Sequence, residues 1–124
     1  MTEYGADYTR RILETVRKNQ GAVYIAERQG EAIGLIAGII AQQSKEELLE
    51  CVLSKDGVVL ELFVDARHRR QKVGTALMRR MEAYFRKKGC NASRVEVFEP
   101  NVKAHKLYGK LGYVDRVIFM TKKL

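Results

Sequence analysis

The residues best suited to chemistry lie in a cation-rich loop, residues 64–77, that joins an apolar segment to an amphipathic one. Gly74 stands where the second segment should begin as a helix, and the preceding loop carries four cations: Arg67, Arg69, Arg70 and Lys72. A helix N-terminus presents unpaired N–H donors and the positive end of the helix dipole, so it attracts anions. This pattern predicts a site for a diphosphate, and therefore an enzyme that uses a nucleotide-like cofactor.

The net charge of +8 is unevenly distributed over the 124 residues. Residues 1–64 hold 7 Lys/Arg and 10 Asp/Glu, a net −3, whereas residues 65–124 hold 16 and 5, a net +11. Such an excess can serve a phosphorylated cofactor or a nucleic-acid backbone. No stripe of basic residues alternates with aromatic ones, and no nucleic-acid motif is visible, so the cofactor is favoured over a nucleic acid.

The length and composition indicate a single globular domain over residues 1–124. No apolar run approaches a membrane span and the first residues lack a signal-peptide pattern, so no membrane partner is expected. Cys51 and Cys90 have no CxxC or Cys/His spacing, which predicts two unpaired thiols rather than a disulfide, and no metal site. A cytoplasmic location fits this cysteine usage.

Hydrophobic periodicity predicts an alternation of helices and strands. Helices are expected over residues 7–19, 72–88 and 101–111, and strands over 22–27, 32–41, 58–64, 94–98 and 113–121. Asp7 is a candidate cap for the first helix, and Gln29-Gly30 predicts a hairpin turn between the first two strands. Residues 44–53 open like a capping box but fit a short helix or a strand equally well. The order indicates a mixed α/β (α+β) domain with helices packed on a sheet.

Two motifs carry a resemblance to a known family. Leu62-Phe63-Val64 is followed by the loop 69–74, which resembles the pyrophosphate loop Arg/Gln-x-x-Gly-x-Gly/Ala of the GNAT N-acetyltransferase superfamily. Arg69 matches its first position and Gly74 its last, but Lys72 stands where the family usually has its first glycine. Glycine allows close approach and unusual dihedral angles. A lysine can do neither as cheaply, but it can adopt helical angles and add a charge, so the loop is still expected to bind.

The second motif, residues 101–113, is similar to the superfamily's C-terminal signature Asn-x-x-Ala-x-x-x-Tyr-x-x-x-Gly-Phe/Tyr, and every defining position is present. The resemblance spans residues 22–121. It implies a GNAT-type mixed, mostly antiparallel sheet with splayed central strands and helices on both faces. Only one helix precedes the first hairpin, so the family's first strand is expected to be missing or reduced.

The resemblance also implies acetyl-coenzyme A as co-substrate. The backbone of Leu62, Phe63 and Val64 would pair with the pantetheine arm, which would lie between strands 58–64 and 94–98 like an added strand. The pyrophosphate would be held by the loop and the helix start, that is, by Arg69, Arg70, Gln71, Lys72, Val73, Gly74 and Thr75. Asn101 would contact the pantetheine or thiol region, and it is also a favourable helix cap.

Two residues are candidates for catalysis. Tyr108 shares a helical face with Ala104, Leu107 and Leu111, so core packing is its simplest role. The resemblance implies a second role, in which the phenol protonates the departing coenzyme A thiolate. Glu61 is an acid in an otherwise apolar strand, and it is either turned to solvent or placed in the cleft as base or acceptor contact.

The predicted function is transfer of an acetyl group from acetyl-coenzyme A to a primary amine, by direct attack in a ternary complex. The alternatives are a coenzyme A-binding module without transferase activity and a small basic RNA- or ribosome-associated domain. The acceptor could be a small-molecule or a protein amine, and the acidic residues of segment 44–56 favour a cationic one. A missing first strand would leave an open sheet edge, which predicts a homodimer.

Overall fold

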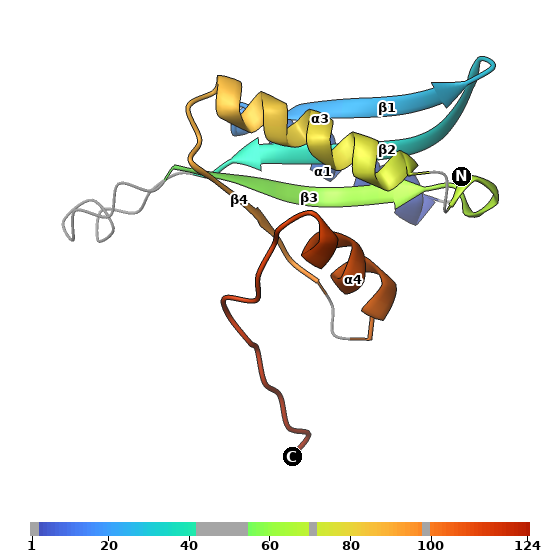
Figure 1. Ribbon diagram of the computed structural model, residues 1–124. Coiled ribbons are helices and arrows are strands. Elements are labelled where there is room, and N and C mark those ends of the chain that lie inside the picture. The colour runs from blue at the N-terminus through green and yellow to red at the C-terminus, as the bar shows by residue number, and fades with distance from the viewer. Residues whose placement is uncertain (1–2, 42–54, 70–71, 98–99) are drawn as a thin grey trace.

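The computed structural model describes residues 3–41, 55–69, 72–97 and 100–124. In chain order the elements are α1 (Glu3–Lys18), β1 (Ala22–Arg28), β2 (Glu31–Ile40), β3 (Asp56–Val64), a 3-10 turn (Ala66–His68), α3 (Val73–Lys87), β4 (Ala92–Val95) and α4 (Val102–Lys110) (Figure 1). The predicted segment 44–53 lies outside the described residues, as do Cys51, Arg70, Gln71 and Phe98.

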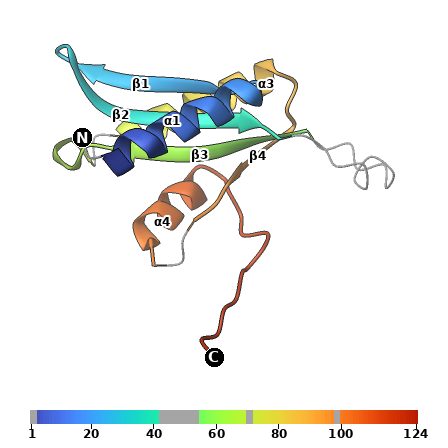
Figure 2. The same cartoon turned by 180° about the vertical axis from the view of Figure 1, so that it is seen from behind.

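The four described strands form one mixed sheet in the order β1-β2-β3-β4. The β1/β2 and β2/β3 pairs are antiparallel, and only β3/β4 is parallel. Helix α3 covers one face and α1 the other, as the two opposite views show (Figures 1 and 2). The predicted mostly antiparallel sheet with helices on both faces is therefore confirmed.

The hairpin turn forms where the sequence predicts it. Gln29 and Gly30 both have positive φ, 53° and 79°. Two consecutive residues of this kind give a turn whose twist matches that of the flanking strands. The register of this hairpin runs from Arg28↔Glu31 to Ala22↔Gly38. Because β2 also pairs with β3, it lies inside the sheet, and it carries apolar residues on both of its faces.

The main core lies between α3 and the sheet. It is built from buried aliphatic, methionine and aromatic side chains: Ile36, Ile40, Val59, Leu77, Met78, Met81, Phe85 and Tyr108. An apolar stripe of α3 supplies Leu77, Met81 and Phe85, with Val73 and Tyr84 partly buried beside them. Because Tyr108 comes from α4, the same core also fixes the position of that helix.

Gly57 is required by close packing in this core. A Cβ atom at Gly57 would lie 2.2 Å from Cγ of Phe85, whose side chain is 2% exposed. We expect Gly57→Ala to lower the free energy of unfolding by about 1–3 kcal/mol, because overpacking forces a buried ring to move. Urea denaturation measures this loss. Gly109→Ala is the control, since nothing lies within 4 Å of its Cβ, and it should raise stability by about 0.5–1 kcal/mol. Equal stabilities of the two variants would contradict this packing.

Three predictions about element bounds are wrong. Helix α1 begins at Glu3, so Asp7 lies inside it and forms an ion pair with Arg10 at 3.5 Å instead of capping it. Strand β4 begins at Ala92, two residues earlier than expected, and ends at Val95. The predicted strand 113–121 is absent from the structure, which describes these residues as irregular. Their apolar pattern suits a strand, but the segment pairs with none of the described strands (Figure 1).

None of the described helices has the length and apolar character needed to cross a membrane. The described residues also contain no group of three or more His, Cys, Asp or Glu side chains placed to hold a metal ion. Cys90 is an unpaired, half-buried thiol.

Candidate functional site

Strands β3 and β4 separate part of the way along the sheet. Their parallel ladder runs from Asp56↔Ala92 to Val59↔Val95 and stops there, while β3 continues to Val64 against β2. Residues 60–64 therefore have no β4 partner in the described structure. The predicted splay is confirmed, and it leaves a strand edge to which an extended ligand with amide groups can add.

A register shift between Ala37 and Gly38 decides which way this edge faces. Ala37 pairs with Glu61 and Gly38 with Val59, so β3 carries one extra residue, Leu60. Beyond Leu60, the side chains of Leu62 and Val64 lie against the start of α3. A Cβ atom placed on Gly74 would be 4.0 Å from Cδ2 of Leu62 and 3.8 Å from Cγ2 of Val64. The exposed Phe63 takes part in pairing with Leu35.

Glu61 faces α1. The Tyr8 hydroxyl donates a hydrogen bond to Oε2 of Glu61 at 2.5 Å, and the glutamate is half-buried. Glu61 is therefore held at the point where the strands separate rather than turned freely to solvent. Tyr8 is a site residue that sequence reasoning missed. The hydrogen bond between Tyr8 and Glu61 joins residues 53 positions apart in the chain. The helical spacing of Tyr8 and Ile12 predicts a helix face but not this contact.

The start of α3 forms an anion-binding end beside the splay. The first helical hydrogen bond runs from Ala76 N–H to Lys72 O, so the N–H groups of Val73, Gly74 and Thr75 have no helical acceptor. No side chain of the described residues caps this end, and its first turn contains no acid. These N–H donors are available to an anion, and the diphosphate site at this helix start stays a prediction.

Lys72 corrects one expectation. It adopts the left-handed conformation, with φ 62° and ψ 21°, and not helical angles. This conformation costs a non-glycine residue about 1–2 kcal/mol. The lysine thus takes the backbone shape that a glycine would allow, and it keeps an exposed ammonium group next to the helix end. The described loop also contains Arg69, whose Nε donates to the Val64 carbonyl at 3.3 Å.

Gly74 brings three elements together. A Cβ on this buried residue would lie 3.4 Å from Leu107 of α4, and β3 lies just beyond that distance. The anion-binding end, the open strand edge and α4 therefore converge on one region. At the start of α4, Asn101 is exposed and its Oδ1 accepts a hydrogen bond from Ala104 N–H at 3.1 Å, which confirms the predicted cap.

Tyr108 lies at the inner end of this region. Its side chain is 7% exposed and packs edge-on against Tyr113, with ring centroids 5.9 Å apart. Burial raises the pKa of the Tyr108 phenol, and the negative charge of Glu61 raises it further. The packing role predicted for Tyr108 is confirmed. The raised pKa keeps the phenol protonated at neutral pH, which a proton donor requires.

Tyr113, the last residue of the second motif, fixes this arrangement. Its hydroxyl donates to Glu82 at 2.8 Å and lies 2.7 Å from the Ser93 hydroxyl, so it links the end of α4 to α3 and β4. His105 bonds to Asp115 at 2.6 Å on the surface. Of the predicted site residues, Arg70 and Gln71 lie outside the described residues. The others belong to β3, the start of α3 and α4, and their binding and catalytic roles stay predictions.

Comparison with known proteins agrees with this geometry. The acetyltransferase (GNAT) family model matches residues 2–113. An uncharacterised N-acetyltransferase of Methanocaldococcus jannaschii is 32% identical over 94 residues, which are 75% of this chain and 53% of that protein. The chain thus spans about half the length of this relative.

Two solved structures share the fold. An aminoglycoside 6′-N-acetyltransferase from Acinetobacter haemolyticus aligns with a TM-score of 0.70 and 20% identity, over 96% of this chain and 81% of that one. An aminoglycoside acetyltransferase in complex with a bisubstrate analogue of coenzyme A and acetylneamine aligns with a TM-score of 0.75 and 24% identity, over 95% and 80%. With a family model that covers nearly the whole chain, this protein belongs to the acetyltransferase (GNAT) family.

Proposed function

We propose that this protein transfers an acetyl group from acetyl-coenzyme A to a primary amine while both substrates are bound. The observation that carries the proposal is the convergence of an uncapped helix start, an open strand edge and the helix α4 that bears the buried phenol of Tyr108. The family membership and the structure of a relative bound to a bisubstrate analogue support it.

Each described group has a task in this reaction. The N–H groups of α3, with Arg69 and Lys72, hold the pyrophosphate, and the edge of residues 62–64 pairs with the pantetheine arm. Asn101 lies at the start of α4 to contact the thiol region. A backbone N–H polarises the thioester carbonyl.

The chemical step needs three proton transfers. Glu61 takes a proton from the ammonium form of the acceptor, and the neutral nitrogen then attacks the thioester carbonyl carbon. A carbon–nitrogen bond forms and the carbon–sulfur bond breaks. Tyr108 donates its proton to the departing sulfur, and its phenolate takes the proton that the new amide nitrogen must lose, so that a neutral amide and coenzyme A thiol leave the site.

Coenzyme A binding tests the first part of the proposal. We expect Arg69→Glu to raise the Kd for coenzyme A more than tenfold, equivalent to about 1.4 kcal/mol or more, because it reverses a charge beside the pyrophosphate. Isothermal titration calorimetry measures the Kd. Lys87→Glu makes the same charge change at the other end of α3, about 20 Å away, and should change the Kd less than threefold. An unchanged Kd in Arg69→Glu would contradict this placement, and no binding by the wild type would contradict the function.

A homodimer is part of the proposal, and the argument for it lies in the C-terminal segment. Five apolar side chains there each expose 79–87% of their surface: Val114, Val117, Ile118, Phe119 and Met120. The segment extends away from the body (Figures 1 and 2), while β4 is an edge strand of the described sheet. An extended apolar segment pairs readily with an open strand edge. In a twofold dimer, the C-terminal segment of each copy can therefore pair with β4 of the other copy.

Sedimentation analysis of the 124-residue chain tests the dimer. We expect twice the mass of one chain for the wild type and a monomer for the double variant Ile118→Lys/Phe119→Lys, because two charges cannot be buried in such a contact. Leu13→Lys is the control, because Leu13 of α1 is also an exposed apolar residue, at 47%. This variant should stay dimeric. A wild-type monomer at every concentration would contradict the dimer.

A further inference from the structure

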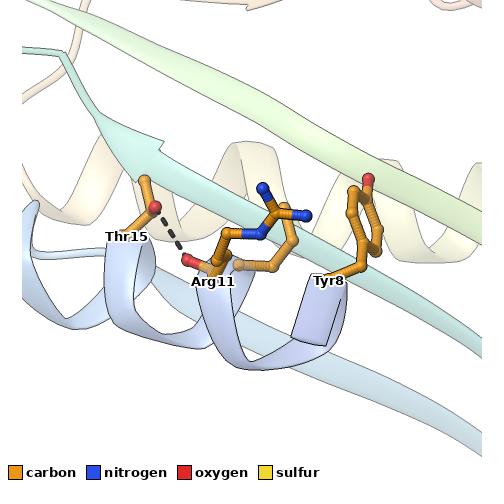
Figure 3. Close-up of a pocket in the computed structure, with 4 residues that line it drawn as sticks. Tyr8, Arg11 and Thr15 are labelled. Atoms are coloured by element: carbon orange, nitrogen blue, oxygen red, sulfur yellow. Dashed lines mark hydrogen bonds between the residues drawn. The ribbon is translucent and has the colours of Figure 1, made fainter. Parts of the chain in front are cut away.

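A groove on α1 lies directly beside Glu61. It has a volume of about 350 Å³ and is lined by Tyr8, Arg11, Ile12 and Thr15. These residues follow helical spacing, so they form one side of α1. Figure 3 shows the Tyr8 ring and the Arg11 guanidinium reaching in the same direction, toward the sheet. Since the Tyr8 hydroxyl donates to Glu61, the carboxylate that we propose as the base lies one hydrogen bond beyond the groove lining.

Arg11 carries a charge that the described protein does not neutralise. Its backbone carbonyl accepts a hydrogen bond from the Thr15 hydroxyl at 2.8 Å, but no ion pair or hydrogen bond of its guanidinium is found among the described residues. The neighbouring Arg10 differs, because it pairs with Asp7 at 3.5 Å and does not line the groove. The groove therefore presents, one helical turn from Tyr8, a guanidinium that has no partner among the residues that the structure describes.

The guanidinium in the groove and the carboxylate beside it have opposite charges. A carboxylate at Glu61 attracts an amine, and a guanidinium binds a carboxylate through two parallel hydrogen bonds. A volume of about 350 Å³ is close to the lower limit of small-molecule sites. A small molecule that carries both an amine and an anionic group satisfies both groups, whereas a diamine would place a second cation against Arg11.

On the basis of the proposed function, we propose that the acceptor is an amine that also carries a carboxylate, such as an amino acid, and that Arg11 selects it. This differs from the cationic acceptor predicted from the acidic residues of segment 44–56, most of which lie outside the described residues. The proposal assigns Arg11 a role in specificity, and it assigns the groove on α1 to the part of the acceptor remote from the reacting nitrogen.

Pairs of acceptors that differ only in one carboxylate test this inference. L-lysine is compared with cadaverine, and L-ornithine with putrescine, by the initial rate of coenzyme A thiol release. We expect kcat/KM to be at least tenfold higher for the amino acid of each pair. Arg11→Ala should reduce this ratio to less than about threefold, mainly by raising the KM of the amino acid, and Arg11→Lys should restore part of it.

Arg10→Ala is the matched control and should keep the wild-type ratio, since Arg10 lies outside the groove. Circular dichroism confirms folding of each variant, and both arginines are exposed. Preference for the diamines, or a ratio that Arg11→Ala leaves unchanged, would overturn this inference while leaving acetyl transfer intact. Absence of thiol release with all four amines in the presence of bound acetyl-coenzyme A would overturn the proposed function, and this inference with it.

Discussion

Replacement of Tyr108 by phenylalanine is expected to lower kcat at least tenfold while leaving the fold and coenzyme A binding near normal. A positioned proton donor typically contributes about 10²–10⁴-fold to a rate, and water can replace part of it. The ring of Tyr108 supplies its packing in the core, and phenylalanine keeps that ring. The measurement is kcat with an acceptor for which chemistry is rate-limiting, together with the Kd for coenzyme A.

Tyr113→Phe is the matched control. Tyr113 contacts the Tyr108 ring, but its own hydroxyl is engaged by Glu82 and Ser93. Its loss should lower stability by about 1–3 kcal/mol and leave kcat near the wild-type value. A wild-type kcat in Tyr108→Phe would show that Tyr108 only packs and that the thiolate leaves without it.

The pH profile gives a second test of Tyr108. Burial and the charge of Glu61 raise its pKa above the ordinary value of about 10, so the donor form persists through neutral pH. At pH values below about 10, deprotonation of Tyr108 should therefore cause no loss of kcat. A loss of kcat near pH 8 that disappears in Tyr108→Phe would contradict this assignment of the phenol.

Replacement of Glu61 by glutamine is expected to lower kcat/KM about 10²–10⁴-fold at neutral pH, because no base then takes the amine proton. The deficit should shrink as the pH approaches the pKa of the acceptor amine, since more of the amine is then neutral in solution. The measurement is kcat/KM against pH for the wild type and the variant. Glutamine keeps the size of the side chain and an oxygen that can accept from Tyr8.

Glu27→Gln is the control for Glu61. Glu27 is exposed on β1, at the opposite edge of the described sheet, so this change removes the same charge far from the site. It should leave kcat/KM within about twofold of the wild type. A Glu61→Gln profile parallel to that of Glu27→Gln at every pH would exclude Glu61 as the base.

Local patterns in the sequence were sufficient for much of the fold. The hairpin turn at Gln29-Gly30, the buried stripe of α3 and the glycines with positive φ after α3 and α4, Gly89 and Gly112, depend on neighbouring residues only. Such features follow from dihedral preferences and from the periods of helix and strand. The two motifs, read as a resemblance, identified the family because their defining residues keep a fixed spacing along the chain.

Contacts between distant segments decided the rest. The extra residue Leu60 turns Glu61 toward α1, and the ladder between β3 and β4 stops at Val59, yet neither event has a local sequence signal. The apolar pattern of 113–121 is typical of a strand, but a strand forms only where an edge is available to pair with it. Lys72 takes a left-handed conformation against its own preference. Tyr8 joins the site through a helix packed on the sheet. The periodicity of a sequence depends on residues that are close together in the chain. The register of strands, the face to which a side chain points and the pairing of edges are instead set by packing across the whole sheet.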